Sequence, residues 1–228
     1  MSDRKRKMPV YVDIALAVAF VAVMALALVQ EAPHEYVGIA VFVLVAVHVA
    51  MHRNWLSSLA KGRYNVVRVL QMASIVALTL CLVGMIASSL VLSKHAFWFL
   101  PALPGASWAR RMHMLCSYWS FVLAFAHAGL QLKNALARIG VRLRGSKALG
   151  SGAIWCMRGV WFVVAAFGAY SFAQLGLPAY LLGQVAFAFA DPTVPLAYTA
   201  LQYASVAVLI TGLFHYLRVL LERAQHTR

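Results

Sequence analysis

The chain has 228 residues, of which 63% are hydrophobic and 11% are charged, and its formal net charge is +14. So apolar a composition excludes an ordinary soluble domain and is typical of a chain embedded in lipid. The excess of Lys and Arg does not indicate a nucleic-acid partner, because no folded basic domain is present to carry that function. We therefore predict an all-α polytopic membrane protein with membrane lipid as its immediate partner.

Six apolar segments follow one another along the chain, and each is close to the ~20 residues that a membrane-spanning helix needs. The sequence predicts these helices at about 12–30, 35–51, 69–92, 112–132, 152–175 and 195–217. The first segment is too long for the apolar region of a signal peptide and ends without a small-residue cleavage site, so we interpret it as a retained helix. The apolar stretch 175–190 is short and contains Pro178, which indicates an interfacial or re-entrant piece.

The polar segments between the predicted helices differ in charge. When these segments are assigned alternately to the two sides of the membrane, 17 of the 20 Lys and Arg fall on the side that carries both termini. The positive-inside rule identifies that side as the cytoplasm, so we predict an inner (cytoplasmic) membrane protein with both termini cytoplasmic. The longest basic loop begins near Lys133 and divides the chain into a four-helix bundle, 1–135, and the loop with two further helices, 136–228.

Two predicted helices carry histidine pairs with the same spacing. The second helix contains His34 and His48, the fourth contains His113 and His127, and both pairs are fourteen residues apart. Fourteen residues are ~21 Å of helix rise and nearly four full turns, so both members of a pair face nearly the same way. Because the second and fourth helices run in the same direction, we expect His34 to face His113 near the outer surface. We likewise expect His48 to face His127 near the inner surface.

Two imidazoles at one depth can hold an iron porphyrin as its axial ligands. The sequence therefore predicts two haem b groups within a cytochrome b-like four-helix bundle, held non-covalently because the chain has no C-x-x-C-H motif. A single histidine in a spanning helix is as often a structural hydrogen-bonding residue. Four histidines in matched pairs favour the cofactor, because a metal group satisfies all four rings in lipid.

Residues near the histidines are further candidates for cofactor binding. Gly38 and Ser117 are small enough to leave room for a porphyrin, although ordinary close helix packing explains them equally well. Arg110 and Arg111 lie one turn outward of His113, where they are candidates for pairing with haem propionates or for anchoring at the membrane interface. His52 lies one turn after His48 and is the alternative inner ligand; otherwise it is a candidate to bind a propionate or a quinone head group at the cytoplasmic surface.

Several short motifs accompany these histidines. They are His34-Glu35-x-x-Gly38, His48 with His52-Arg53-Asn54-Trp55, Lys61-Gly62-x-Tyr64-Asn65, Leu92-Ser93-Lys94-His95, and Arg111-x-His113-Met114 with Tyr118-Trp119 and His127. Over roughly residues 10–135 the chain resembles the flavinylation-associated cytochrome family of bacterial membrane proteins. The resemblance implies a b-type cytochrome that passes electrons between the quinone pool or the cytoplasmic side and an extracytoplasmic, flavin-bearing redox protein. No flavin-attachment motif is present, so the flavoprotein would be a separate chain.

The sequence thus predicts an electron-transfer component of an oxidoreductase system rather than a stand-alone enzyme. The alternative is a haem-free membrane anchor or scaffold subunit of a larger complex, which would use the last two helices to hold a partner. A small transporter is a third interpretation, but the apolar segments show no pair of broken helices, and Asp13 is the only acidic residue well inside one.

Overall fold

The structure is a computed structural model that describes residues 3–26, 31–53, 65–101, 103–138, 151–188, 191 and 193–226. These residues are mainly helical, and no strand occurs among them. The motif residues Asn54-Trp55 and Lys61-Gly62-x-Tyr64 lie outside the described residues, as does most of the predicted basic loop, 139–150.

Six long helices and one short helix make up the described chain. They are α1 (Asp3–Leu26), α2 (Glu31–Met51), α4 (Val66–Leu92), α5 (Ala106–Arg138), α6 (Ser151–Gln174), α7 (Leu177–Leu181) and α8 (Leu196–His226). Each predicted span coincides with one long helix, and the interrupted stretch 175–190 contains only the short α7. Helices α5 and α8 extend several residues beyond the predicted segments, because a helix can continue past its apolar part into polar surroundings.

Five of these helices, α1, α2, α4, α5 and α8, are long and apolar enough to cross a membrane. Large apolar side chains are exposed along the bundle, among them Val18, Leu80, Val83, Phe162 and Leu220. Lipid accommodates such a surface and water does not, which agrees with a membrane protein. The sixth predicted span, at α6, stays a prediction.

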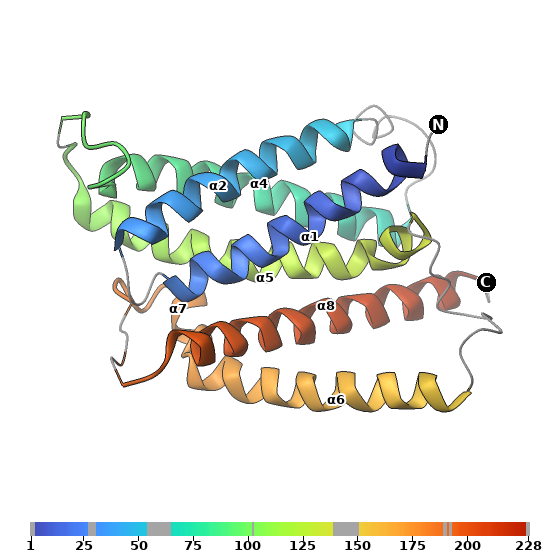
Figure 1. The fold of residues 1–228 in the computed structure, drawn as a ribbon. Helices are drawn as coiled ribbons and strands as arrows, with labels where there is room; N and C mark the ends of the chain where they lie inside the picture. The colour runs from blue at the N-terminus through green and yellow to red at the C-terminus, as the bar shows by residue number, and fades with distance from the viewer. Residues whose placement is uncertain are drawn as a thin grey trace.

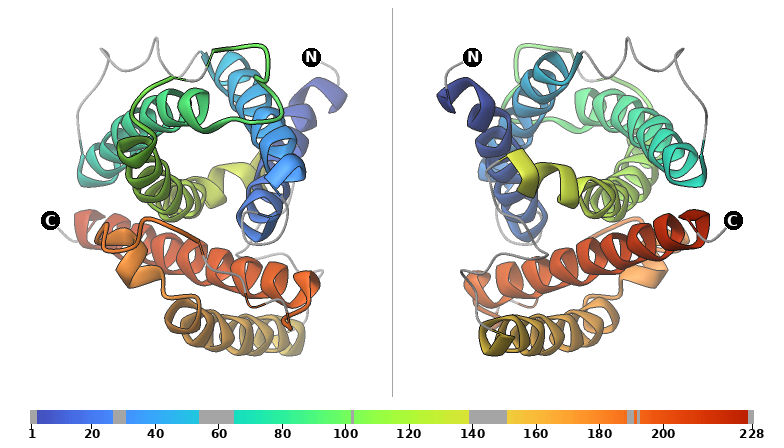
Figure 2. Two further views of the ribbon diagram at one scale, coloured as in Figure 1. Left: turned by 90° about the vertical axis from the view of Figure 1, so that its left-hand side faces the viewer. Right: turned by 90° about the vertical axis from the view of Figure 1, so that its right-hand side faces the viewer.

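The long helices alternate in direction (Figure 1). Helices α2, α5 and α8 run one way and α1, α4 and α6 the other, so the start of α1 and the end of α8 lie at the same end of the bundle. Helices α1, α2, α4 and α5 surround a common axis, while α8 packs beside α1 and α5 and α6 covers α8 (Figure 2). The parallel course of α2 and α5 agrees with the sequence prediction and sets their histidines at matching depths.

The buried core lies between α1, α5, α7 and α8. Phe121 and Tyr203 are almost fully buried there, and the Tyr118 ring stacks on the Tyr180 ring at a centroid distance of 4.1 Å. The hydroxyl oxygens of Tyr118 and Tyr203 are 3.2 Å apart and share a hydrogen bond. One core therefore combines residues from both sides of position 135, where the sequence suggested a division.

Close helix packing in this bundle depends on glycine at particular positions. A Cβ atom added at Gly168 of α6 would collide with the Ser205 carbonyl oxygen of α8, whereas a Cβ at Gly159, on the same helix, would meet nothing within 4 Å. We expect Gly168→Ala to destabilise the protein by about 1–3 kcal/mol, the usual cost of overpacking. Thermal unfolding in detergent should show a lower midpoint for Gly168→Ala and an unchanged one for Gly159→Ala; equal midpoints would contradict this account.

Candidate functional site

His34 of α2 and His113 of α5 meet at one end of the bundle. Their ring centroids are 6.1 Å apart and their ring planes are inclined at 71°. Two imidazoles that bind one metal from opposite sides at about 2 Å each have ring centres about 6 Å apart. The spacing of this outer pair, as we call it, is therefore suited to a shared metal.

His48 of α2 and His127 of α5 form a second pair. Each lies fourteen residues after the outer histidine of its own helix. His127 is near enough to His48, His52 and Asp13 to interact with them electrostatically, so all four belong to the same end of the bundle. The His48 ring centroid is 4.5 Å from that of His52. We call His48 and His127 the inner pair, because their end of the bundle also carries the start of α1 and the end of α8.

Each ring of the two helices has a hydrogen-bond partner at Nδ1. On α2, His34 Nδ1 donates to the Val23 carbonyl at 3.0 Å, and His48 Nδ1 donates to Asp13 Oδ1 at 2.7 Å. Both partners belong to α1. Val23 lies in the last turn of α1, where the helix leaves carbonyl groups without an internal donor, so His34 also satisfies this helix end.

The Nδ1 atoms of the two histidines of α5 contact serine hydroxyl groups of α4. His113 Nδ1 lies 3.4 Å from Ser88 Oγ, and His127 Nδ1 lies 3.3 Å from Ser74 Oγ. Ser88 Oγ already donates to the Gly84 carbonyl, and Ser74 Oγ to the Gln71 carbonyl. A hydroxyl has only one hydrogen to donate, so each serine oxygen accepts from the histidine.

These contacts fix the tautomer of His34, His48 and His127. His113 Nδ1 lies 3.4 Å from Ser89 Oγ as well as from Ser88 Oγ, and the Ser89 hydroxyl is able to donate to it. When Nδ1 carries the hydrogen, Nε2 keeps its lone pair, which is the form of neutral imidazole that binds a metal. An Nδ1–H group held by a carboxylate, carbonyl or hydroxyl oxygen is also the usual second contact of a metal-binding histidine. The rings of His34, His48 and His127 therefore have the protonation that axial ligation requires.

Asp13 distinguishes the two candidate inner ligands. Its Oδ1 accepts from His48 Nδ1 at 2.7 Å and lies 3.6 Å from His52 Nε2. His52 Nε2 is buried and has no hydrogen-bond partner among the described residues. His48 faces Asp13 with Nδ1, so its Nε2 points away from Asp13 and is free to bind a metal. His52 faces Asp13 with Nε2, the nitrogen that a ligand would need. The structure therefore favours His48, which also has the matched spacing, as the inner ligand.

Helix α2 is set apart from the other histidine helix. No Cα atom of α2 lies within 8 Å of a Cα atom of α4 or α5 in the described chain, although α4 and α5 approach each other that closely. No residue of α2 is buried. Helices in direct contact have axes about 8–10 Å apart, so α2 is further from α5 than ordinary packing places it. The rings of His34 and His113 reach across this distance.

The predicted small residues Gly38 and Ser117 belong to α2 and α5. A Cβ atom at Gly38 would meet only Val23 Cγ2, at 4.0 Å, so the position is open apart from one contact with α1. Ser117 is buried on α5, and its hydroxyl donates to the Met114 carbonyl at 3.0 Å. Gly38 therefore leaves room beside His34, whereas Ser117 is covered by its neighbours and its part in cofactor binding stays a prediction.

The two predicted propionate partners lie at the outer end of α5. Arg110 and Arg111 are both exposed. The guanidinium carbon of Arg110 is 5.1 Å from the centroid of the Phe187 ring, a cation–π distance. Arg110 is thus engaged with the segment after α7 in this structure, and the propionate role of both arginines stays a prediction.

Glu35 connects the start of α2 to the segment that follows α4. Its carboxylate accepts from Ser93 Oγ at 2.7 Å and from the backbone N–H groups of Lys94, His95 and Ala96 at 2.8–3.0 Å. Four donors to one carboxylate make a strong, directional contact. The Glu35 clamp, as we call it, holds the residue next to His34 against the end of the α4–α5 pair.

Sequence reasoning missed four residues whose side chains contact the histidines: Asp13, Ser74, Ser88 and Ser89. A signal was present for Asp13, Ser74 and Ser88. Ser74 and Ser88 are fourteen residues apart, the spacing of both histidine pairs, on a helix that runs opposite to α5. Asp13 was a carboxylate within an apolar segment, where an ionisable group needs a partner.

Protein-family models, curated proteins and solved structures were searched, and none matches the chain. The chemistry of the site therefore has to be inferred from its residues. They provide two levels of paired imidazoles on two helices kept apart, with a lone pair on Nε2 of His34, His48 and His127.

Proposed function

We propose that the protein is a dihaem b-type cytochrome that carries electrons across the membrane. His34 and His113 would be the axial ligands of the outer haem, and His48 and His127 those of the inner haem. The observation that carries the proposal is the set of Nδ1 contacts, because those of His34, His48 and His127 leave Nε2 available on each of these rings. The 6.1 Å separation of the outer rings and the wide setting of α2 support it.

A bound haem supplies reversible one-electron chemistry at its iron. The protein's own residues contribute position and environment. The fourteen-residue spacing sets the two pairs of imidazoles ~21 Å apart along the bundle, so that electrons have a relay point near each surface. Asp13, Ser74, Ser88 and the Val23 carbonyl keep the rings from rotating. The surrounding apolar helices exclude water and disfavour additional charge.

We further propose the partners that the family resemblance implies. Electrons would pass between the quinone pool or the cytoplasmic side and an extracytoplasmic redox protein bearing flavin. The Glu35 clamp supports the proposed partners, because it brings together His34-Glu35 and Ser93-Lys94-His95. These are two of the motifs on which the family resemblance depends. The chain would then be one component of an oxidoreductase system.

A second candidate function comes from the Asp13 cluster. The ligand atoms of Asp13, His48 and His52 all lie within 4.8 Å of one another, so these side chains could bind a single transition-metal ion without porphyrin. In that case Asp13 would be a ligand itself. This candidate leaves the outer pair and its serine unexplained, and for that reason we favour the dihaem proposal.

The purified protein, expressed with sufficient haem, provides the test. We expect the visible absorbance of low-spin b-type haem and a pyridine haemochrome ratio of two haems per chain. Metal analysis of the same sample separates the candidates, because iron should equal haem and no other transition metal should be present in stoichiometric amount. A colourless protein with one equivalent of non-haem metal would favour the Asp13 site, and a colourless protein without metal would favour the scaffold.

A further inference from the structure

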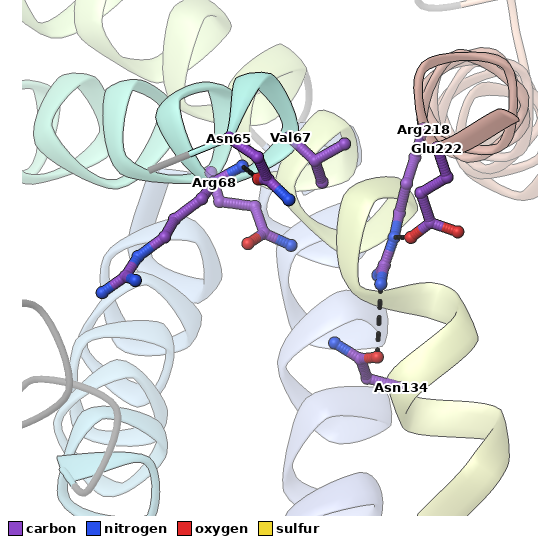
Figure 3. Close-up of a pocket in the computed structure, with 7 residues that line it drawn as sticks. Asn65, Val67, Arg68, Asn134, Arg218 and Glu222 are labelled. Carbon is purple, nitrogen blue, oxygen red and sulfur yellow. Dashed lines mark hydrogen bonds and ion pairs between the residues drawn. The ribbon is translucent and has the colours of Figure 1, made fainter. Parts of the chain in front are cut away.

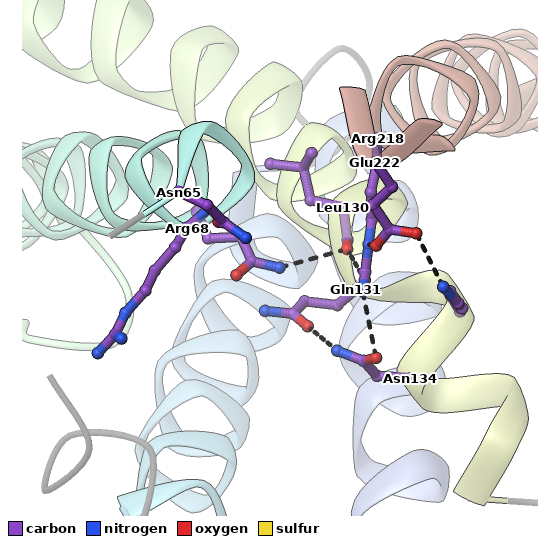
Figure 4. Close-up of polar contacts among 9 residues, drawn as sticks. Asn65, Arg68, Leu130, Gln131, Asn134, Arg218 and Glu222 are labelled. Carbon is purple, nitrogen blue, oxygen red and sulfur yellow. Dashed lines mark hydrogen bonds and ion pairs between the residues drawn. The ribbon is translucent and has the colours of Figure 1, made fainter. Parts of the chain in front are cut away.

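Two groups of side chains stand out apart from the histidine pairs, and the first of them is structural. Its members line a pocket of about 250 Å³ between α4, α5 and α8 (Figure 3). Arg218 Nε donates to Glu222 Oε1 at 2.8 Å. The same guanidinium donates to Asn134 Oδ1 at 3.4 Å and contacts the Leu130 carbonyl (Figure 4). The buried charge is therefore paired, and its contacts join α8 to α5.

The second group consists of sulfur atoms where α4 packs against α5. Cys81 belongs to α4, and Met112 and Cys116, one turn apart, belong to α5. Cys116 Sγ lies 3.4 Å from Met112 Sδ. The Cys81 thiol is within hydrogen-bonding reach of the Cys116 thiol and of the Ser120 hydroxyl. We call Cys81, Met112 and Cys116 the sulfur cluster.

The sulfur cluster lies between the depths of the outer and inner histidine pairs. Cys81 is seven residues from both Ser74 and Ser88. These two serines contact His127 and His113, and seven residues are ~10 Å of helix rise. The cluster is therefore near the middle of the predicted spans. An ion at this depth is stable only when its ligands replace water.

Gly84 makes room for the sulfur cluster. A Cβ atom added at this position would be 2.6 Å from Cys116 Sγ and 3.4 Å from Met112 Sδ, so any larger residue would displace Cys116 Sγ. Cys116 is buried, whereas Cys81 is partly exposed. An ion can therefore approach the cluster from the side of Cys81.

Three sulfur ligands suit a soft metal ion. Thiolates and thioethers select Cu(I), whereas Zn(II) is normally bound by four Cys, His or carboxylate ligands, and the sulfur cluster has only two of these. Metal–sulfur bonds of about 2.3 Å place two sulfur ligands of one ion about 3.3–4.6 Å apart, for bond angles from about 90° to 180°. The 3.4 Å between Met112 Sδ and Cys116 Sγ is within that range. Because the thiolate is the ligand, binding displaces a thiol proton, and loss of one proton per Cu(I) leaves the site electrically neutral.

We propose that the sulfur cluster binds one Cu(I) ion between α4 and α5, with Cys81, Met112 and Cys116 as its ligands. The proposal is carried by the meeting of three soft ligands from two neighbouring helices at one point. Binding is exchangeable, so protein grown without added copper leaves the site empty and its metal content reports the histidine sites alone. The proposal does not depend on whether the protein binds haem.

The test is equilibrium dialysis of the full-length protein in detergent against Cu(I) buffered by a chelator, under reducing conditions. Copper analysis then gives the ions bound per chain, and iron is measured separately. Cys81→Ser and Cys116→Ser each remove a thiolate ligand, and Met112→Leu removes the thioether while it nearly conserves side-chain volume. The matched controls are Cys156→Ser, an exposed cysteine of α6, and Met114→Leu, two residues from Met112 on the same helix. Met114 packs against the buried core rather than in the sulfur cluster.

We expect one Cu(I) per chain in the unaltered protein and none in Cys81→Ser or Cys116→Ser. Met112→Leu should weaken binding at least about tenfold, because even loss of an outer contact of a metal ligand has an effect of this size. Cys156→Ser and Met114→Leu should keep full binding. If the serine variants do not fold, Met112→Leu against Met114→Leu decides the question. Absence of copper from the unaltered protein, retention of copper in both serine variants, or equal weakening in the two methionine variants would overturn the proposal.

Discussion

Replacing His113 by Leu is expected to lower the haem content from two per chain to one. Leu has no donor for the metal, and the facing His34 cannot hold a haem in the same six-coordinate state alone. His48→Leu should have the same effect at the inner level. Pyridine haemochrome analysis of the purified variants measures the ratio, and the low-spin spectrum of the remaining haem should be retained because the two levels are ~21 Å apart.

His52→Leu is the matched control for His48→Leu. His52 is one turn away on the same helix, its ring lies 4.5 Å from that of His48, and it faces Asp13 through Nε2. We expect His52→Leu to keep two haems per chain. If His52→Leu lost a haem and His48→Leu did not, the inner ligand would be His52. If every variant kept two haems, the pairing of α2 with α5 would be wrong.

Asp13→Asn is expected to raise the midpoint potential of one haem and leave the other unchanged. The Asp13 carboxylate accepts from His48 Nδ1, increases the electron donation of the imidazole and adds a negative charge near the iron. Both effects stabilise the oxidised form, which carries one more positive charge than the reduced form. Asn is nearly the same size and can still accept the hydrogen bond, so the variant removes mainly the charge. A spectroelectrochemical titration would resolve the two potentials.

Asp13→Glu provides the rescue for this experiment, because it restores the carboxylate on a longer side chain. We expect it to return the shifted potential toward its original value. Two haems with unaltered potentials in Asp13→Asn would show that Asp13 has only a structural role at His48. Absence of haem from the unaltered protein would instead contradict the proposed function as a whole, so the two failures can be told apart.

The helices and the depths of the histidines could be predicted because each depends on a local pattern. Apolar segments of about 20 residues identify spanning helices, and the fourteen-residue spacing of His34 and His48 is a whole number of turns within a small error. The helix ends were less accurate. Helix α8 continues to His226, beyond its predicted end at 217, because hydropathy marks where the lipid ends and not where the backbone hydrogen bonds end.

The partners of the histidines were harder to predict because they depend on which helices are neighbours. Asp13 meets His48 across 35 residues, and Ser74 meets His127 across 53. Nothing in either segment alone specifies that α1 lies beside α2 and α4 beside α5. The Glu35 clamp joins residues about 60 positions apart, and its backbone donors become available only once the chain turns after α4.

The partners of the two histidines on α2 differ in charge. His34 is held by a neutral backbone carbonyl of Val23, whereas His48 is held by the carboxylate of Asp13. Under the proposed function, the Asp13 carboxylate would lower the midpoint potential of the inner site, while the outer site has the Glu35 carboxylate near His34. A carbonyl cannot be removed by changing a side chain, so sequence variation at Asp13 would be the simpler way to adjust the difference in potential between the two sites.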